Sequence, residues 1–287
     1  MRALLFLLLA GGISLLLLVY PLLPGSYDPA GSSLSMAFQL FSVLGLLTLI
    51  PAAAWLYRAL RLRRAAAEDA PALRAMRRHA RAYLWTFAAV WIPIVLVLTL
   101  SVSRITGLLL GLGLILGIWQ ALRRISQVRT LAGFPPVLPA LLALWPAALL
   151  GVHLLLSTPL TAWSRARAIA HSRELAAQLE SFHTQHGSYP LTINGLHQDY
   201  QTGVCGIEAF RYTYDGSTYH LYFEQPKLFL DQPGTREMVV YSPAGEPFMM
   251  SHVSWHMLIE PELIRSRQGW YAANETGMPG WRYLWFD

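Results

Sequence analysis

The sequence predicts an α+β membrane protein, in which five transmembrane helices precede a small domain with one long helix packed on an antiparallel β-sheet. Hydrophobic residues make up 54% of the 287 residues and charged residues only 13%, whereas roughly a quarter of the residues in an ordinary soluble protein are charged. Apolar runs of about 20 residues, each long enough to cross a bilayer, recur as far as residue 157. The pattern then changes to that of an amphipathic helix and alternating strands. We therefore divide the chain into a transmembrane domain, residues 1–157, and an outer domain, residues 158–287.

The distribution of charge argues against a nucleic-acid partner. The formal net charge is +6, but 12 of the 22 basic residues lie at position 2, between positions 58 and 81, or between positions 123 and 129. From residue 158 onward, nine basic residues stand against thirteen acidic ones. A domain that binds nucleic acid carries a basic surface, and the composition of the outer domain is the opposite.

Residues 3–23 form the first predicted span. They follow a single arginine and are apolar for about 20 residues, the length that crosses the hydrocarbon core. A secretory signal peptide is the alternative, but its apolar part usually has about 7 to 15 residues and leads to an A-x-A cleavage site, which does not follow here. We therefore expect a retained helix and a short external loop after it.

Residues 34–57 form the second predicted span, which leads into eight arginines between positions 58 and 81. Short loops rich in arginine stay on the cytoplasmic side, so this segment is predicted to be a cytoplasmic loop. The arginines are interpreted as determinants of topology; a site for anionic lipid headgroups or a cytoplasmic partner is the alternative. The topology and lipid candidates are Arg58, Arg61, Arg63, Arg64, Arg77 and Arg78.

Residues 82–100 and 105–122 form the third and fourth predicted spans, joined by a tight turn. The fourth span contains two glycine pairs at small-xxx-small spacing, which lets helix backbones approach closely. Packing against a neighbouring helix is the expected role, and a seam between two copies of the chain is the alternative. These helix-packing glycines are Gly107, Gly111, Gly113 and Gly117.

Residues 137–157 form the fifth predicted span, after three more arginines return the chain to the cytoplasmic side. Five crossings would place the N-terminus in the cytoplasm and the outer domain on the other side of the membrane. His153 lies near the outer end of this span. An ionisable residue at membrane depth is a candidate functional residue, but we expect this one to reach water, and no second ionisable residue in the span cores could form a relay with it.

The outer domain is predicted to begin with a helix over residues 161–186, where apolar residues recur at helical spacings. We expect this helix to continue the fifth span with a break or bend near Pro159, and to end at a Gly187 cap. From residue 209 onward the period becomes two. Alternation on both sides of Asp215-Gly216 predicts a β-hairpin, whose aromatic stripe is expected to pack on the helix. Further strands are expected at residues 238–241, 248–251 and 281–286.

The helix end and the hairpin resemble type IV pilins and type II secretion pseudopilins. In these families the long N-terminal helix ends in a G-x-Y-P turn, and here residues 173–186 lead into Gly187-Ser188-Tyr189-Pro190. The hairpin and the segment 239–245, Val-Val-Tyr-Ser-Pro-Ala-Gly, resemble the pseudopilin sheet. The resemblance covers roughly residues 137–251 and implies a pilin-like outer domain whose helix lies half in the membrane and half outside.

Two departures from the family pattern indicate a tethered domain and not a filament subunit. Pilin precursors have a glycine at the cleavage site and a glutamate soon after it in the apolar segment, but here two prolines follow Gly133-Phe134 and the fifth span has no acidic residue. The four preceding spans would also prevent extraction into a filament. Some pseudopilins bind calcium through loop carboxylates, but Glu246 alone does not supply the six to eight oxygens that calcium takes.

One metal site is conceivable from the spacing of residues. His252, His256 and Glu260 would share one face of a helix and could hold a zinc ion with one open position. The segment does not match H-E-x-x-H, and a surface helix is the simpler interpretation. We therefore expect no metal and no cofactor.

The single cysteine, Cys205, excludes an intrachain disulfide and a four-cysteine zinc site. It lies in the flexible segment Gly203-Val204-Cys205-Gly206. As a nucleophile it would need a positioned base, for which His197 or His220 could serve. A small buried hydrophobic residue is the simpler interpretation.

The C-terminal end is rich in aromatic residues, which either complete the core of the outer domain or form an interface. The interface candidates are Tyr189 and Pro190 at the helix end and Trp255, Trp270, Trp281 and Trp285 near the C-terminus.

No catalytic motif is found, so a non-enzymatic role is expected. The resemblance implies a periplasmic domain that binds another envelope protein in a secretion or pilus-related assembly. A membrane-integral enzyme, a transporter or an envelope sensor, with the outer domain as an accessory, is the alternative. The expected partners are membrane lipids, a periplasmic protein and, through the glycine-lined helix, a second copy of the chain.

Overall fold

The structure is a computed structural model, and it describes residues 2–64, 70–196, 200–214, 216–231, 233–243, 248–249, 257–258 and 271–286. The chain divides into two compact units. Unit 1 comprises Met1–Leu18 and Ser33–Leu155, and unit 2 comprises Val19–Ser32 and Leu156–Asp287. The first loop of the chain, residues 19–32, therefore belongs to the same unit as the C-terminal domain. The sequence-based division at residue 157 did not predict this.

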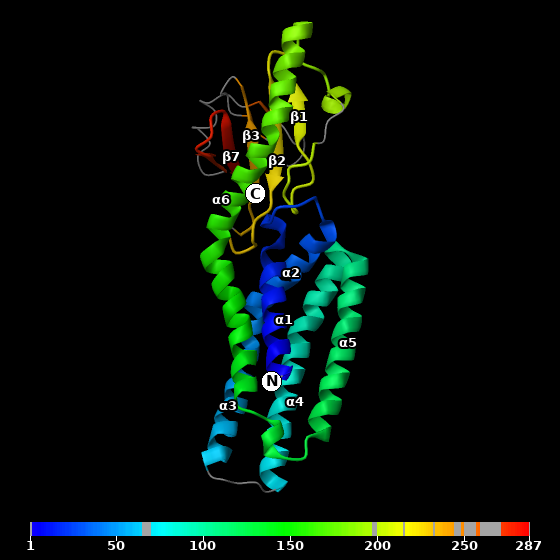
Figure 1. Cartoon of the computed structure of the whole chain (residues 1–287), viewed down its shortest axis with the longest axis vertical. Coiled ribbons are helices and arrows are strands. Elements are labelled where there is room, and N and C mark those ends of the chain that lie inside the picture. Colours follow the sequence, from blue (N-terminus) through cyan, green and yellow to red (C-terminus); the bar gives the residue numbers. More distant parts are fainter. Residues whose placement is uncertain are drawn as a thin grey trace. The chain divides into compact units, whose positions relative to one another are not determined.

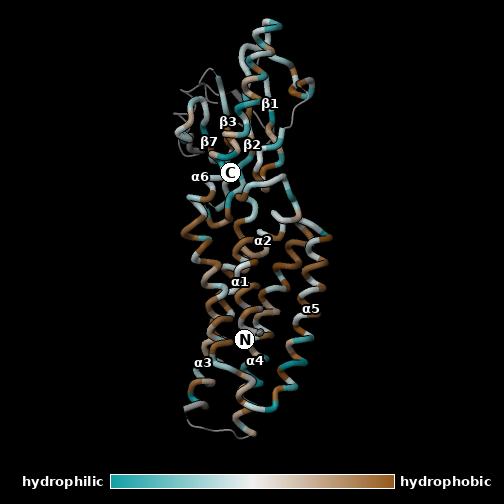
Figure 2. The backbone as a smooth tube through the Cα atoms, in the orientation of Figure 1, coloured by the Kyte–Doolittle hydropathy of each residue, from teal (hydrophilic) through white to brown (hydrophobic). Residues whose placement is uncertain are grey.

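Unit 1 is helical (Figure 1). Four helical stretches in the described residues are long and apolar enough to cross a membrane, and a shorter apolar stretch covers Leu8–Leu22. Apolar residues line these helices along most of their length (Figure 2). This composition is compatible with a multi-pass membrane protein. The four long stretches are Pro29–Leu62, Ala70–Leu100, Arg104–Gln127 and Val137–His186.

The helices differ from the predicted spans mainly in where they end. Helix α1 covers Arg2–Val19, and the second stretch consists of α2 (Pro29–Leu44), a 3-10 turn (Gly45–Thr48) and α3 (Leu49–Arg64). Helix α4 (Ala70–Val97) begins well before the predicted third span.

All eight arginines between positions 58 and 81 therefore lie on α3 or α4 and not in the expected loop, because Ala, Leu, Met and Arg are strong helix formers. Helix α4 runs through Pro93 and leads into a π-helical turn, Leu98–Val102. Helix α5 (Arg104–Gln127) starts at Ser103, whose side chain accepts a hydrogen bond from the Thr106 amide.

An aromatic cluster fills the interior of unit 1. Phe41 stacks on Trp91 with ring centroids 5.0 Å apart, and meets Phe87 and Trp145 edge-on at 5.7 and 5.5 Å. These rings come from α2, α4 and α6, so they join three helices that are far apart in the sequence. Offset and edge-to-face pairs of this kind each add about 0.5–1.5 kcal/mol beyond the burial of their area.

Unit 2 contains the second part of α6 (Val137–His186) and a five-stranded antiparallel sheet in the order β1-β2-β3-β7-β6. A two-stranded pair, β4 and β5, is separate from it. The strands of the sheet are β1 (Arg211–Tyr214), β2 (Tyr219–Gln225), β3 (Arg236–Tyr241), β6 (Tyr271–Glu275) and β7 (Trp281–Phe286), and those of the pair are β4 (Phe248–Met249) and β5 (Met257–Leu258).

The predicted helix, hairpin and last strand are confirmed, and two details differ. A break or bend was expected near Pro159, but α6 is continuous through this residue, so the break is wrong. A strand was expected at residues 248–251, and β4 lies there. Among the described residues β4 pairs only with β5 and not with the main sheet, which the sequence did not predict. Strand β6 was not predicted, because its sequence Tyr-Ala-Ala-Asn-Glu has neither alternation nor β-branched residues.

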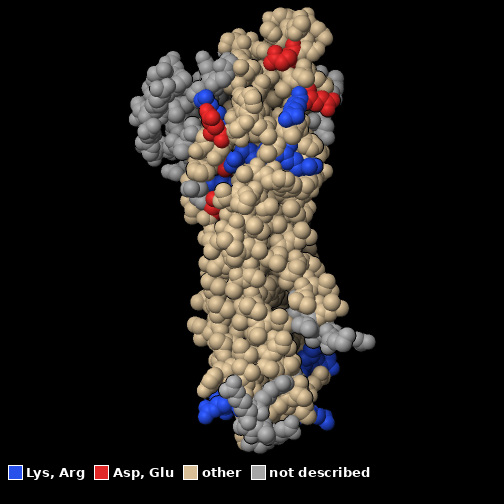
Figure 3. All heavy atoms as spheres, turned by 60° about the vertical axis from the view of Figure 1, so that its left-hand side comes forward, with Lys and Arg blue, Asp and Glu red and all other residues tan. Residues whose placement is uncertain are grey.

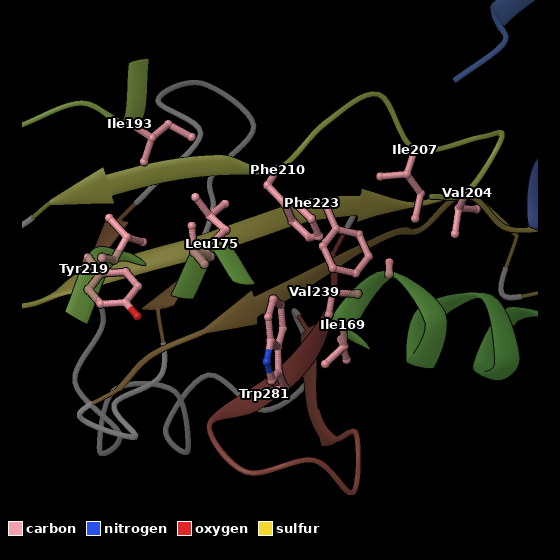
Figure 4. Close-up of a cluster of buried hydrophobic side chains, with 13 residues drawn as sticks. Ile169, Leu175, Ile193, Val204, Ile207, Phe210, Tyr219, Phe223, Val239 and Trp281 are labelled. Atoms are coloured by element: carbon pink, nitrogen blue, oxygen red, sulfur yellow. The ribbon is translucent and has the colours of Figure 1, made fainter. Parts of the chain in front are cut away.

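One face of α6 packs on the sheet and forms the core of unit 2 (Figure 4). Leu175 and Leu179 of the helix are 4% and 0% exposed, and Phe223 of β2 and Val239 of β3 are both 0% exposed. Fully burying such side chains contributes about 1.5–3 kcal/mol each. The helix ends at Gly187, whose φ of 73° suits glycine and whose amide donates a hydrogen bond to the His183 carbonyl.

The first loop pairs with the segment around Cys205 within unit 2. The Gly25 amide donates to the Gly203 carbonyl at 3.1 Å, and the Cys205 amide donates to the Leu23 carbonyl at 2.9 Å. Pro24 and Val204 form an antiparallel bridge. Gly25 has to be glycine here, because a Cβ would lie 2.5 Å from the Cys205 sulfur.

Asp28 closes this loop and caps α2. Its Oδ1 atom accepts hydrogen bonds from the Ala30 and Gly31 amides at 2.9 and 3.0 Å, and its Oδ2 atom accepts one from the Tyr20 hydroxyl at 2.9 Å. These bonds, above all the one from the Gly31 amide, lower the pKa of the Asp28 carboxyl, because they stabilise its charged form.

Replacing Asp28 by alanine should lower stability by about 1 kcal/mol at pH 7, the typical cost of losing an N-cap. A lowered pKa makes the contribution fully present above about pH 4, where an unfolded aspartate ionises, and lost as the pH falls through the folded value. The loss of unfolding free energy caused by Asp28→Ala should therefore be smaller at pH 3 than at pH 7. Denaturant unfolding of the full chain in detergent measures it. Glu174→Ala is the control, and an equal penalty at both pH values would contradict the role assigned to Asp28.

Candidate functional site

Unit 2 contains a polar cleft of about 410 Å³, which is the candidate functional site. The end of β2 and the start of β3 form one side, and the loops 206–209 and 226–235 form the others, with Tyr27 of the first loop at the margin. This volume falls within the range of about 300–1,000 Å³ of small-molecule pockets. The charged residues that line the cleft are Glu208, Arg211, Glu224, Lys227, Asp231, Arg236 and Glu237.

Close backbone packing shapes one side of the cleft. A Cβ on Gly206 would lie 2.6 Å from the Pro21 carbonyl oxygen and 2.9 Å from Pro226, so only glycine fits between the first loop and the segment after β2. The Gly206 amide donates to the same Pro21 carbonyl at 2.9 Å. The first loop thus holds one side of the cleft in place.

A buried ion pair, of which Glu237 lines the cleft, ties α6 to the sheet. Arg165 of α6 contacts Glu237 of β3 at 2.6 Å, and the two side chains are only 11% and 1% exposed. The second carboxylate oxygen of Glu237 accepts a hydrogen bond from the Trp285 indole at 3.0 Å, and the Arg165 guanidinium lies 3.7 Å from the centre of the Tyr283 ring. Each charge is therefore paired and hydrogen-bonded, as a buried charge requires.

Lys227 lies half-buried beside this ion pair. Its ammonium group donates to the Thr235 hydroxyl at 2.6 Å and lies 5.8 Å from the Trp285 ring centre. Burial lowers the pKa of Lys227, and the charges of Glu237 and Asp231 oppose that shift. The cleft therefore places a partly desolvated cation close to carboxylates.

Two exposed ion pairs lie at the rim. Arg211 and Glu208 are 3.7 Å apart, and Arg236 and Glu224 are 3.9 Å apart. Because all four side chains are more than a third exposed, these pairs contribute little to stability and can be rearranged by a ligand.

The Tyr189-Pro190 turn, an interface candidate, is bound into unit 2. The Tyr189 hydroxyl donates to Glu180, its ring stacks on His183 with centroids 4.3 Å apart, and the Tyr212 hydroxyl donates to the Pro190 carbonyl at 2.6 Å. Burial and the neighbouring Glu180 carboxylate raise the pKa of Tyr189. The turn thus holds the end of α6 against β1, which is a structural role.

The C-terminal tryptophans fall into two groups. Trp281 is 7% exposed and belongs to the core of unit 2, and Trp285 donates to Glu237. Trp255 and Trp270 lie outside the described residues, as do the metal candidates His252, His256 and Glu260. In the part of the chain that the structure describes, no group of three or more His, Cys, Asp or Glu could hold a metal ion.

Cys205 is buried in unit 2 and packs on the first loop. Its sulfur lies 3.5 Å from the Pro24 carbonyl oxygen, and the thiol is free. The structure gives it no hydrogen bond to a histidine among the described residues. Its environment fits the interpretation as a small buried residue.

In unit 1, His153 is buried and bonded across helices. Its side chain is 0% exposed, and Nδ1 lies 3.0 Å from the Ser42 hydroxyl of α2. The expectation that His153 reaches water is wrong within this unit, because α2 covers it. Ser42 also donates to the Gln39 carbonyl at 2.7 Å, so a polar network lies inside the helical unit.

The four glycines of α5 divide into two pairs. A Cβ on Gly107 would lie 2.7 Å from the backbone of Thr99, and one on Gly111 would meet Val95 at 3.3 Å, so this pair packs on the preceding helix and π-helical turn. Gly113 and Gly117 have no heavy atom within 4 Å of such a position. Packing within the hairpin therefore explains the first pair only.

Basic side chains are visible at one end of unit 1 (Figure 3). Arg61 and Arg78 are exposed, whereas Arg58 and Arg77 are partly buried, and Arg77 donates a hydrogen bond to the Val128 carbonyl. The side chains of Arg63 and Arg64 are outside the described residues. Arg77 thus has a structural bond besides any role in topology.

No protein-family model, no curated protein and no solved structure matches this chain.

Replacing Glu237 by glutamine should destabilise the protein by about 3–5 kcal/mol, because the Arg165 charge is then buried without its partner. The side-chain oxygen of a glutamine can still accept a hydrogen bond from the Trp285 indole. The loss of stability therefore reports the removal of the negative charge. The double variant Arg165→Met, Glu237→Met should recover most of the loss. Denaturant unfolding of the full chain in detergent measures both.

Glu224→Gln is the matched control, since it breaks an exposed pair and should cost less than about 1 kcal/mol. Equal losses for Glu224→Gln and Glu237→Gln would contradict the importance of the buried pair.

Proposed function

We propose that this chain is a bacterial inner-membrane protein with five spans, whose pilin-like periplasmic domain binds another protein of the cell envelope in a secretion or pilus-related assembly. The observation that carries the proposal is α6, which is apolar in its first part, amphipathic in its second, packed on an antiparallel sheet, and ended by the Gly187-Ser188-Tyr189-Pro190 turn. This combination is what the resemblance to pilins and pseudopilins leads one to expect.

The topology has a second, independent support in unit 2. Residues 21–28 pair with the segment 203–206, which supports placing the first loop and the C-terminal domain on the same side of a membrane. An even number of crossings must then separate them. The four long apolar stretches supply that number, and α1 adds the fifth crossing of the proposal.

The side of the membrane follows from the arginines. Short basic segments remain in the cytoplasm, and eleven arginines mark one end of these helices: they lie in the last part of α3, the first part of α4, and the end of α5 or just after it. With this end inside, the outer domain faces the periplasm. The proposal includes neither a catalytic activity nor a cofactor.

The domain is proposed as a tethered adaptor and not as a filament subunit. The apolar part of α6 has no acidic residue, and pilin subunits use such a residue to register on a neighbour. The exposed charges of unit 2 are of both signs, which suits a polar protein surface better than a nucleic acid.

One observation favours a second candidate function, a transporter or sensor in which the spans form the site. The buried Ser42 and His153 pair is a polar contact inside the helical unit, and ionisable residues at membrane depth often mark transport or signalling pathways. Loss of the cellular phenotype on changing His153→Asn, with the protein partner still bound, would support this candidate over the first.

The proposed function is tested with a photo-crosslinking phenylalanine analogue placed in the full chain in its own cells. At Leu191, which is 82% exposed in unit 2, and at Glu208 on the rim of the cleft, the analogue should give a discrete crosslink to one envelope protein. At Leu109, which is 66% exposed on α5, it should give none to that protein. Crosslinks to that protein from Leu109 only, or no protein crosslink from unit 2, would contradict the proposal.

A further inference from the structure

Unit 1 has a basic end whose charges no carboxylate balances in the part of the chain that the structure describes. Eleven arginines lie in the last part of α3, the first part of α4, and the end of α5 or just after it. The two acidic residues in the sequence of this unit, Glu68 and Asp69, lie outside the described residues. Clusters of arginine beside a membrane-spanning helix attract anionic headgroups. Topology alone also requires such charges, so a binding site needs a defined arrangement of side chains as well.

Helices α4 and α5 form an antiparallel pair that keeps its register up to the basic end (Figure 1). Away from that end, a Cβ on Gly107 would lie 2.7 Å from the backbone of Thr99. At the basic end, Arg81 of α4 donates a hydrogen bond to the Ser126 hydroxyl of α5 at 3.3 Å. Nearly the same number of residues separates these two contacts along each helix, so levels on α4 can be compared with levels on α5.

One exposed face of α4 changes from basic to apolar at a tryptophan. Arg78, Arg81 and Trp85 are exposed and recur at spacings of three and four, so they share this face. Trp85 is 59% exposed, and Ile92 and Leu96, which are 53% and 54% exposed, continue the face. A rise of 1.5 Å per residue places Arg81 about 6 Å beyond the tryptophan along the helix.

An exposed face of α5 has the same order in the opposite chain direction. Leu112, Ile115, Trp119 and Arg123 recur at spacings of three, four and four, and the first three are 55%, 66% and 56% exposed. The guanidinium of Arg123 lies 5.8 Å from the centre of the Trp119 ring. Figure 2 shows α5 turning from apolar to polar towards this end. The arginine again lies one turn beyond the tryptophan.

The bond between Arg81 and Ser126 brings these two faces together. Ser126 follows Arg123 by three residues and therefore lies on the same side of α5. In the register of this bond, Trp85 and Trp119 lie within about one helical turn of the same depth. We call Arg81, Trp85, Trp119, Arg123 and Ser126 the headgroup site.

The chemistry of the headgroup site fits one phosphate group attached to apolar chains. A guanidinium has five N–H donors and matches phosphate oxygens in pairs, and the exposed bond to Ser126 is a small commitment of those of Arg81. Tryptophan is enriched at the interface between headgroups and acyl chains. The exposed apolar faces of α4 and α5 then continue from the two tryptophans. Inorganic phosphate would leave these faces unused, whereas a phospholipid uses both parts.

We propose that the ends of α4 and α5 bind an anionic phospholipid, whose phosphate lies between Arg81 and Arg123 and whose acyl chains lie along the apolar faces beyond Trp85 and Trp119. This inference rests on the membrane-spanning part of the proposed function and not on the periplasmic partner. It assigns a lipid to two of the eleven arginines, while the rest of the basic end keeps its role in topology.

The test is native mass spectrometry of the purified full chain in detergent, titrated with phosphatidylglycerol or with phosphatidylethanolamine that has the same acyl chains. The first phosphatidylglycerol should bind at least about tenfold more tightly than the first phosphatidylethanolamine, because charge-assisted hydrogen bonds to the anion exceed those to a zwitterion. Inorganic phosphate in molar excess should not displace it. Equal binding of the two lipids, or displacement by inorganic phosphate at equal concentration, would overturn the proposal.

Variants locate the lipid. Arg81→Gln with Arg123→Gln should lower the affinity for phosphatidylglycerol at least about tenfold, to that for phosphatidylethanolamine. Arg61→Gln with Arg74→Gln is the matched control, since it removes two exposed arginines from the same basic end and should leave the affinity nearly unchanged. Both double variants must keep the unfolding midpoint of the parent chain. If the first does not, Arg123→Gln alone replaces it. Equal losses in the site variant and the control, or no loss in a folded site variant, contradict the proposal.

The crosslinking experiment separates this inference from the proposed function. If phosphatidylglycerol has no preference for the headgroup site while Leu191 still crosslinks to an envelope protein, only the lipid site is wrong. If the lipid binds as expected and unit 2 crosslinks to no envelope protein, the proposed function is wrong and the lipid site stands.

Discussion

The burial of one face of α6 against the sheet is the interaction on which unit 2 depends. Leu175 and Leu179 of the helix pack with Phe223 and Val239 of the sheet, and all four are nearly or fully excluded from solvent. Because this contact fixes the helix across the strands, the Arg165 guanidinium is placed against Glu237, which lines the cleft. The cleft is thus a consequence of how the helix and strands pack.

The first loop is a further constraint, because it joins a segment near the N-terminus to the C-terminal domain. Its hydrogen bonds to the segment 203–206 and the cap at Asp28 make residues 19–32 part of unit 2. In a membrane protein this pairing limits the topology, since both segments must be on one side. Gly25 and Gly206 permit the close approach that the pairing requires.

Local hydrophobic patterns in the sequence predicted most of the helices and strands, whereas contacts between distant segments could not be predicted. The alternation around residue 216 and the helical spacing of residues 168–182 correspond to β1, β2 and α6, because both patterns report burial on one face. Strand β6 and the pairing of the first loop lack such a pattern. One residue of the site could have been noticed in the sequence, because Glu237 is an acidic residue in a strand that is otherwise largely apolar. Its partner Arg165 lies 72 positions away, and no sequence spacing identifies the pair.

The central claim, that unit 2 lies outside the cytoplasm, is tested most directly by thiol labelling in intact cells, since the chain has a single, buried cysteine. Leu191→Cys introduces an exposed thiol in unit 2, and Arg74→Cys introduces one near the basic end of unit 1. With the outer membrane opened, a membrane-impermeant maleimide should label Leu191→Cys at once and Arg74→Cys only after lysis. The reverse order would contradict the topology and every role built on it.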